Sequence, residues 1–192
     1  LGKCSLGAAV PIIAAFGIEP VMLPTAVLST HTGAGFTDFT FKDLTSDMPG
    51  IIAHWKKLNI SFDAMYFGYL GSIAQLDTVA EFFDYFKNQS NLVFVDPVMG
   101  DNGKLYHGFD EAFVKKMYAF CSHADIICPN VTEACFLTDT PYREEHDEAY
   151  ATELAYKLQK TGAKIVVITG VTNKNKYGAL CLDTVTGKIH TH

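Results

Sequence analysis

The stretch LVFVDPVMG, residues Leu92–Gly100, contains the features that decide the fold. Its first four residues, Leu92–Val95, form a continuous apolar run, which suits a strand of a parallel sheet that is covered on both faces. Asp96 and Pro97 follow directly, and such a pair is typical of a chain that turns as it leaves a strand. The stretch therefore predicts a buried parallel strand with a carboxylate at its carboxyl end.

Strands and helices are expected to alternate on either side of this strand. The clearest helix is Ser72–Lys87, which opens with Ser72 and Gln75 in a capping-box pattern and places its apolar residues on one side. The expected helices are residues 4–16, 43–57, 72–87, 109–120, 130–137 and 144–160, and the expected strands are 20–28, 63–67, 92–95, 125–128, 164–168, 177–183 and 188–191. This alternation predicts an α/β fold with a mostly parallel, doubly covered sheet. No internal repeat or linker divides the chain, so one domain over 1–192 is expected.

Two further features concern the first third of the chain. The apolar run from Cys4 to Phe16 is expected to form a helix packed inside the domain. A polar, glycine-containing stretch, Ser29–Thr37, is followed by an alternation of Phe and Thr, which predicts a mobile loop or hairpin.

Composition restricts the classes of partner. The chain has 192 residues, with 15 Lys and Arg against 21 Asp and Glu, and a formal net charge of -6. The basic residues form no cluster, so neither nucleic acid nor an anionic membrane is expected as a partner. The five cysteines include no C-x-x-C pair, which favours reduced thiols over a zinc site or a disulfide framework.

Polar residues follow each expected strand, and ligands of parallel α/β sheets collect at the carboxyl ends of the strands. The candidate site residues are His31, Thr32, Tyr69, Asp96, Asn130, Glu133 and Thr169. A structural role is open for several of them. Asn130 and Glu133 form a capping-box pattern, and Asp96 could simply begin a turn. Tyr69 could be a core aromatic residue and Thr32 a loop hydroxyl.

Four motifs resemble the pyridoxal/pyridoxamine kinases of the ribokinase-like superfamily. They are LPTAVLSTHTG at 23–33, GYLGS at 68–72, VDPVMGDNGKLY at 95–106 and ADIICPNVTEA at 124–134. They occur in the order of that family and cover most of the chain. Hydroxymethylpyrimidine phosphate kinases share the D-P-V-M and P-N-x-x-E elements but lack the STHTG and GYLGS pair, and they are the alternative within the superfamily.

The resemblance implies a three-layer α/β/α fold and ATP-dependent phosphorylation of the 5'-hydroxyl of pyridoxal, pyridoxine or pyridoxamine. It assigns His31, Thr32 and Tyr69 to the substrate, and Asp96, Asn130, Glu133 and Thr169 to ATP, with Asp96 and Glu133 near Mg²⁺. Residues 33–40 would form part of a flap over the substrate. A cytoplasmic homodimer is also implied. Phosphoryl transfer depends on charge neutralisation and positioning, for which carboxylates that hold a hard cation are suited.

The family's first strand and its G-x-G-D motif, whose Asp deprotonates the attacking hydroxyl, are expected ahead of Leu1 and beyond His192. No catalytic base is therefore assigned among these residues, and we expect them to be inactive alone. A non-catalytic module that binds pyridoxal or a nucleotide is the alternative from another functional class.

Overall fold

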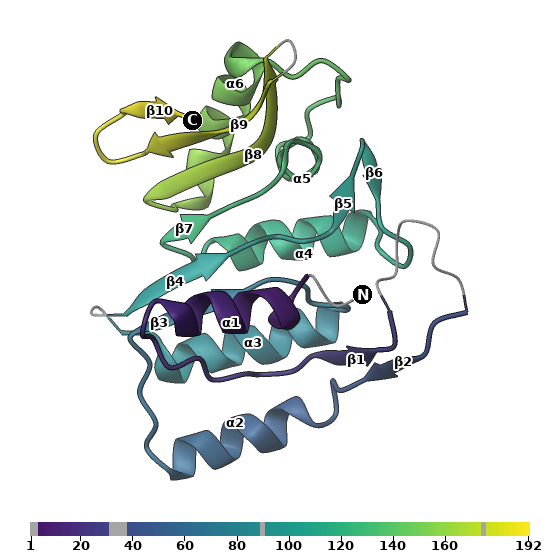
Figure 1. Cartoon of the computed structure of the whole chain (residues 1–192), viewed down its shortest axis with the longest axis vertical. Helices are drawn as coiled ribbons and strands as arrows, with labels where there is room; N and C mark the ends of the chain where they lie inside the picture. Colours follow the sequence, from purple (N-terminus) through teal and green to yellow (C-terminus); the bar gives the residue numbers. More distant parts are fainter. Residues whose placement is uncertain (1–3, 31–37, 89–90, 174–175) are drawn as a thin grey trace. The chain divides into compact units, whose positions relative to one another are not determined.

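The computed structural model describes residues 4–30, 38–88, 91–173 and 176–192 (Figure 1). The chain divides into two compact units, Leu1–Ile60 and Ser61–His192, and each is described by itself. The prediction of one domain over 1–192 stays a prediction.

The first unit contains two helices and a two-stranded ribbon. Its elements are α1 (Leu6–Ala15), β1 (Ala26–Leu28), β2 (Phe41–Asp43) and α2 (Met48–Lys57). β1 and β2 are antiparallel, with Val27 opposite Lys42. This pairing flanks the stretch that was expected to be a mobile loop or hairpin, and residues 31–37 of that stretch lie outside the described residues. Residues 33–37 of the predicted flap lie outside the described residues. The expected helix α1 forms, but none of its residues is buried, so its predicted place inside a domain is wrong.

The second unit is built on a six-stranded sheet in the order β10-β9-β8-β7-β4-β3. The strands are β3 (Ala64–Phe67), β4 (Leu92–Val95), β7 (Ile126–Ile127), β8 (Ile165–Asn173), β9 (Lys176–Asp183) and β10 (Ile189–Thr191). The four strands from β3 to β8 are parallel to one another, and β9 and β10 add antiparallel pairs. The predicted α/β fold with a mostly parallel sheet is confirmed.

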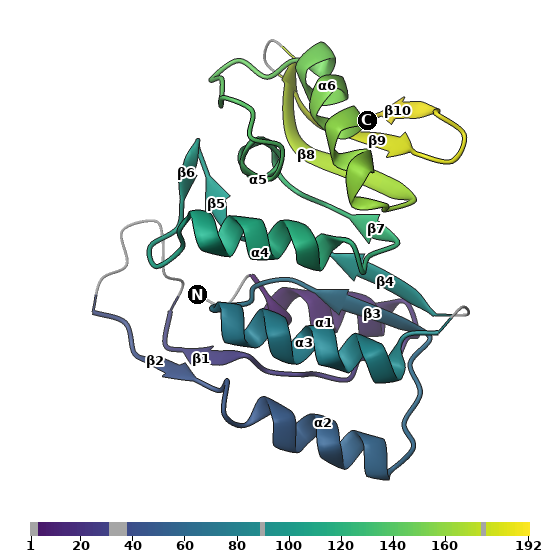
Figure 2. The same ribbon diagram turned by 180° about the vertical axis from the view of Figure 1, so that it is seen from behind.

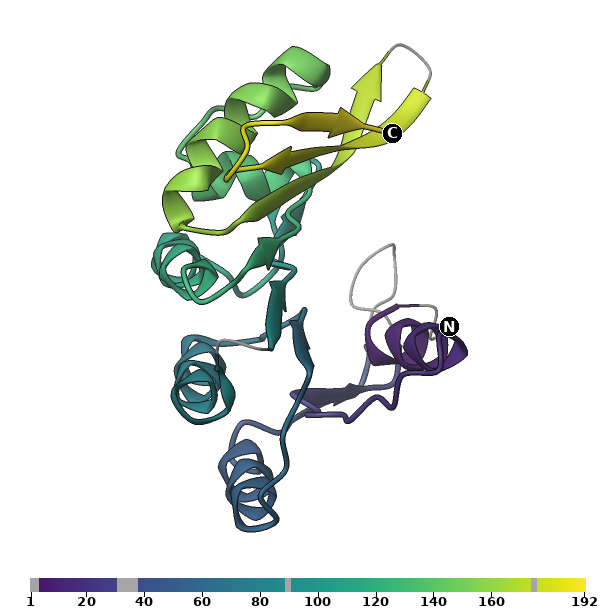
Figure 3. The ribbon, with the colours of Figure 1, turned by 90° about the vertical axis from the view of Figure 1, so that its left-hand side faces the viewer.

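Helices α3 to α6 of this unit lie on one face of the sheet (Figures 2 and 3). They are α3 (Ile73–Phe86), α4 (Glu111–Cys121), α5 (Val131–Leu137) and α6 (Glu148–Leu158), the last continued by a short 3-10 turn, Gln159–Thr161. The buried side of α3 carries Leu76, Val79 and Phe83, and the Phe83 ring lies 5.1 Å from that of Phe67 on β3. Apolar burial of this kind is the main favourable contribution to folding.

Side-chain caps decide where the helices begin. The Ser72 hydroxyl accepts the Gln75 backbone N–H at 3.3 Å, as predicted, but the Gln75 side chain accepts the N–H of Gly71 instead of Ser72. Helix α6 begins at residue 148 rather than the expected 144, because the Asp147 carboxylate caps it by accepting the N–H of Tyr150 at 2.9 Å.

A short hairpin that was not predicted follows β4. Its strands are β5 (Gly100–Asp101) and β6 (Lys104–Leu105), joined by Asn102 and Gly103. Both turn residues have positive φ, 50° and 73°, as a two-residue type I′ turn requires. The Asn-Gly pair is itself a strong hairpin signal, so the sequence contained the information that would have predicted this element.

Candidate functional site

The parallel strands of the second unit end at one edge of the sheet and bring several predicted residues there. Asp96 follows β4, and its N–H donates to the carbonyl of Phe67 at the end of β3, at 2.8 Å. Asn130 follows β7 and forms a parallel bridge with Thr169 of β8. The structure therefore places Asp96 and Asn130 at the carboxyl edge, as predicted from strand order. Thr169 was expected to follow a strand that ends at 168, but β8 continues to Asn173, so Thr169 lies inside the strand and is level with this edge through its bridge to Asn130. His31 and Thr32 lie outside the described residues.

Glu133 is held at the start of α5 by two backbone segments. One carboxylate oxygen accepts the N–H of Asn130 at 2.8 Å, and the other accepts the N–H of Met99 at 3.1 Å. The Asn130 side chain accepts the N–H of Glu133 in return, so the capping box is present. Glu133 is 3% exposed, and this burial is the main reason that its pKa rises to about 8, with the charge of Asp96 adding to the shift against the backbone N–H groups.

The first turn of α5 also holds the β5–β6 hairpin in place. The Asn130 amide donates to the carbonyl of Gly100 at 2.8 Å, and the Thr132 hydroxyl accepts the N–H of Gly103 at 2.9 Å. Together with the bond from Met99 to Glu133, these contacts fasten the hairpin to the helix at three points. The polar residues at the start of α5 are therefore structural whether or not they also contact a ligand.

Asp96 is the other carboxylate at this edge. Burial raises its pKa to about 6, while a long hydrogen bond from the Tyr66 hydroxyl, 3.4 Å, acts in the opposite direction. The pKa of Tyr66 rises to about 12, chiefly through burial and then through the charge of Asp96. Burial disfavours the ionised form of both carboxylates, and the charge of Asp96 adds to this at Glu133, so a nearby cation would offset both penalties.

Tyr69 lies after β3 and is half-buried. Its ring centroid is 6.0 Å from that of Phe109, in a tilted arrangement. A Cβ atom at Gly71 would lie 3.2 Å from the Tyr69 hydroxyl oxygen and 3.4 Å from the ring, so a larger residue at 71 would crowd this side chain. Tyr69 therefore lies beside a second aromatic ring, and its assignment to the substrate stays a prediction.

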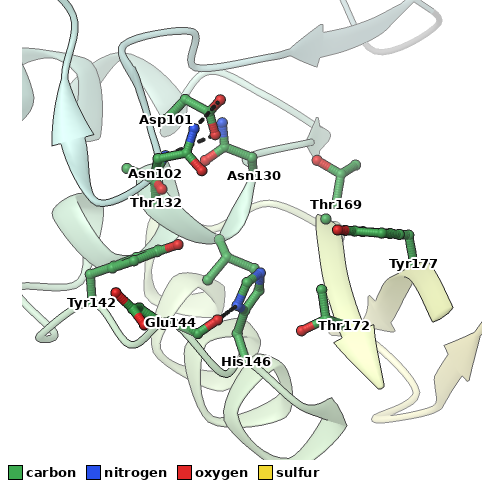
Figure 4. A pocket seen from close by; sticks show the side chains of 12 residues that line it. Asp101, Asn102, Asn130, Thr132, Tyr142, Glu144, His146, Thr169, Thr172 and Tyr177 are labelled. Atoms are coloured by element: carbon green, nitrogen blue, oxygen red, sulfur yellow. Dashed lines mark hydrogen bonds between the residues drawn. The ribbon is translucent and has the colours of Figure 1, made fainter. Parts of the chain in front are cut away.

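A cavity of about 500 Å³ lies among the hairpin, the start of α5, the loop before α6 and the strands β8 and β9 (Figure 4). It is lined by Asp101, Asn102, Asn130, Val131, Thr132, Tyr142, Glu144, His146, Thr169, Gly170, Thr172 and Tyr177. Two predicted ATP residues, Asn130 and Thr169, line it, whereas Asp96 and Glu133 do not. Such a volume lies within the range of small-molecule sites.

Sequence reasoning missed most of the cavity wall. Asp101 and Asn102 come with the unpredicted hairpin, for which the Asn-Gly pair was the available signal. Tyr142, Glu144 and His146 belong to a stretch that was expected to be partly helical and is instead a loop. No periodicity or motif marks those three residues, because only the fold brings them to the site.

The carboxyl edge fits a magnesium ion that arrives with a nucleotide. Among the described residues, no group of three or more His, Cys, Asp and Glu side chains is arranged to hold a metal by itself. Mg²⁺ is commonly bound through one or two carboxylates together with water and substrate phosphates. Asp96 and Glu133 are the two carboxylates that could take this role, since the charge of Asp96 is one of the causes that raise the pKa of Glu133.

Comparison with protein families decides the assignment. The family model described as phosphomethylpyrimidine kinase matches residues 47–191, which is well over half of the chain. The chain belongs to this family. Within it, the resemblance to pyridoxal kinases is confirmed: a curated pyridoxal kinase from Dictyostelium discoideum is 38% identical over 113 residues, which are 56% of this chain and 36% of that protein.

Two solved structures are similar to almost the whole of this chain. A Bacteroides thetaiotaomicron protein, described as a candidate phosphomethylpyrimidine kinase and crystallised with pyridoxal, is 39% identical with a TM-score of 0.91, covering 98% of this chain and 66% of that one. A Leishmania donovani pyridoxal kinase in complex with ADP and pyridoxamine is 26% identical with a TM-score of 0.81, covering 99% and 66%.

The chain spans about a third of the length of the first curated relatives and about two thirds of these solved structures. Within the part that the structure describes, every helix is too short or too polar to cross a membrane.

Proposed function

We propose that the protein to which this chain belongs is a vitamin B6 kinase. It transfers the terminal phosphoryl group of ATP to the 5'-hydroxyl of pyridoxal, pyridoxine or pyridoxamine, with Mg²⁺ on the nucleotide. The observation that carries the proposal is the similarity of almost the entire chain to a protein that was crystallised with pyridoxal. The geometry of the carboxyl edge supports it.

On the nucleotide side, Asn130 and Thr169 contact ATP from the wall of the cavity, and Asp96 and Glu133 hold the metal beside it. Bound Mg²⁺ supplies charge neutralisation for the phosphates. Asn130 and Glu133 are also fixed by the capping box, so their positions do not depend on the ligand. Such preorganised groups lower the cost of assembling the charged transition state.

On the substrate side, the Tyr69 ring provides a face for the pyridine ring, with Phe109 behind it. We assign His31 and Thr32 to substrate binding from their motif alone. The catalytic base belongs to the G-x-G-D motif expected after His192 in the full-length protein. We also propose that this protein is a cytoplasmic homodimer, as its family resemblance implies.

A hydroxymethylpyrimidine phosphate kinase is the second candidate, favoured by the description of the matching family model. Both substrates are substituted heteroaromatic rings, but the acceptor is a hydroxymethyl group in pyridoxal and a phosphomethyl group in hydroxymethylpyrimidine phosphate. The nucleotide side of the site would serve either. Side-by-side rates with pyridoxal and hydroxymethylpyrimidine phosphate separate the two. A non-catalytic binding module would bind pyridoxal or a nucleotide but form no ADP with either substrate.

The experiment uses the full-length protein and measures ADP formation with each substrate, for the wild type and for Asp96→Asn. Within the described part of the chain, the Asp96 carboxylate accepts the Tyr66 hydroxyl at 3.4 Å and fixes no backbone N–H, so this variant should fold normally and lose activity by about 100-fold or more. The control is Asp77→Asn, an exposed carboxylate on α3 that pairs with Lys116. Pyridoxal-dependent turnover that is unchanged in Asp96→Asn would contradict the assigned metal site.

A further inference from the structure

His146 is fixed in the wall of the cavity by two hydrogen bonds. Its backbone carbonyl accepts the N–H of Thr172 on β8 at 3.0 Å, which ties the loop before α6 to the sheet. Its ring atom Nδ1 lies 2.9 Å from the backbone oxygen of Glu144. A carbonyl oxygen can only accept, so Nδ1 carries the hydrogen in both the neutral and the charged ring.

This arrangement leaves Nε2 for a ligand. Figure 4 shows the His146 ring rising from its loop into the space bounded by Asn130, Thr169 and Tyr177, with Nδ1 bonded to the Glu144 oxygen. The residue is partly buried, and it belongs to the lining of the cavity. In the imidazolium form Nε2–H is a donor aimed into that cavity, whereas in the neutral form Nε2 is an acceptor.

The charges of the residues that line the cavity make this donor the main candidate for binding an anion. Among the described residues that line it, His146 is the only one whose side chain can become positively charged, and Asp101 and Glu144 are acidic. A phosphate group in this cavity would therefore meet two carboxylates and a single cationic partner. Charge-assisted hydrogen bonds to phosphate oxygens are among the stronger ones in proteins.

We propose that His146, as the imidazolium ion, binds a phosphate group of the nucleotide through Nε2–H. The inference rests on the proposed nucleotide site and adds to it a residue that makes phosphate binding depend on pH. Several titratable groups face His146 from the elements around it. They are Tyr142, Glu144, Asp101 and Tyr177, which line the same cavity, and Asp147 is the next residue in the sequence. The carboxylates among them repel a phosphate group, and the imidazolium is the cationic partner that would offset this repulsion.

The test measures the dissociation constants of ADP and of adenosine by isothermal titration with the full-length protein at saturating magnesium. The proteins are the wild type, His146→Gln and His146→Lys, with His190→Gln as a control for an exposed histidine on β10. The measurements are made at about pH 5.5 and about pH 8, where histidine side chains in general are mostly charged and mostly neutral. Because Asp96, Glu133 and ADP itself change charge in this range, each variant is compared with the wild type at the same pH.

At about pH 5.5, His146→Gln should weaken ADP binding by about five- to tenfold, and the effect should fall to less than about twofold at about pH 8. Adenosine, which has no phosphate, should bind all four proteins equally. His146→Lys should bind ADP at about pH 8 more tightly than the wild type does, because lysine keeps its charge there.

Three results would overturn the inference, and they differ in what they say of the proposed function. If His146→Gln matched the wild type for ADP at both pH values, the phosphate contact would be wrong while the nucleotide site stood. If the wild type failed to bind ADP at all, the proposed nucleotide site and this contact would both be wrong. An equal loss of ADP and adenosine affinity in His146→Gln would also overturn the phosphate contact, since it would indicate general damage to the cavity.

Discussion

A single carboxylate, that of Glu133, joins the end of the D-P-V-M loop to the start of α5. The capping pattern predicted its bond to Asn130, whereas its bond to the N–H of Met99 comes from a residue 34 positions away. A carboxyl group keeps two oxygens that accept in either protonation state, and a Gln side chain has only one. The metal-binding and structural roles of this residue can therefore be separated by experiment.

Glu133→Gln should lower the free energy of unfolding by about 1–3 kcal/mol, because one buried backbone N–H would face an amide NH₂. From the capping pattern alone, only a few tenths of a kcal/mol would be expected. Urea denaturation measures the change, and Asp147→Asn is the matched control, since Asn caps a helix about as well as Asp. Equal and small losses in both variants would show that the Met99 bond contributes nothing.

The Tyr69 side chain should contribute to the affinity for pyridoxal and not to the affinity for ADP. Tyr69→Ala in the full-length protein should weaken pyridoxal binding by about 1 kcal/mol or more through loss of a stacking face, and leave ADP affinity unchanged. Isothermal titration with each ligand measures this, and Tyr156→Ala, an exposed tyrosine on α6, is the control. Loss of ADP binding with intact pyridoxal binding would mean that the two halves of the site are assigned the wrong way round.

At the scale of the elements, Asp125 joins three neighbouring strands at their amino ends. Its carboxylate accepts the N–H of Val93 on β4 at 3.0 Å and pairs with Lys164, just before β8, at 2.9 Å. Burial works to raise the pKa of Asp125, but these two partners outweigh it and the pKa is lowered. An acid with a lowered pKa stabilises the folded state above its ordinary pKa, and this stability is lost as the pH falls through the folded value.

Asp125→Asn should therefore cost about 1 kcal/mol of unfolding free energy at neutral pH, and the cost should shrink below about pH 4, where the wild-type carboxylate is protonated as well. Denaturation curves across this pH range test it. Asp77→Asn, which removes an exposed ion pair, should show a smaller and less pH-dependent change. A cost that stays constant with pH would exclude the ionised carboxylate as its source.

The β5–β6 hairpin depends on a glycine that sits against an aromatic ring. A Cβ atom at Gly103 would lie 2.6 Å from Cδ1 of Tyr142, and the residue has a φ of 73°. Gly103→Ala should destabilise the protein by about 1–3 kcal/mol through backbone strain and this overlap. Gly108→Ala is the matched control, because Gly108 also has positive φ but nothing within 4 Å.

The melting temperature should fall further for Gly103→Ala than for Gly108→Ala. Adding Tyr142→Ala to Gly103→Ala should restore part of the lost melting temperature. Equal losses at the two glycines would mean that the Tyr142 ring moves aside without cost.

At the scale of the whole molecule, residues 1–192 by themselves should not phosphorylate pyridoxal. A positioned general base contributes about 10²- to 10⁴-fold to a rate, and the resemblance places that base after His192. Pyridoxal phosphate formation by this chain and by the full-length protein, compared at equal concentration, measures the difference. A rate for residues 1–192 close to that of the full-length protein would show that one of these residues acts as the general base.

Local sequence pattern predicted the fold class, most of the helices and strands, and some of the residues at the carboxyl edge of the sheet. The apolar run Leu92–Val95 became β4 with the same bounds, and the capping pairs at Ser72 and Asn130 began their helices, because such signals act through neighbours in sequence. Residues that follow parallel strands converge at one edge of the sheet, so Asp96 and Asn130 could be placed there from strand order alone. Thr169 lies inside β8, because this strand is five residues longer at its carboxyl end than the apolar run predicted.

Only the tertiary structure decided which of these residues share the cavity and what else lines it. His146 and Tyr142 carry no local signal, and they reach the site because the loop before α6 is tied to β8 and the hairpin is fastened to α5. The second bond of Glu133 and the raised pKa of both carboxylates arise from burial between segments distant in sequence. Such effects depend on which segments meet and exclude water, and that is determined by packing rather than by local pattern.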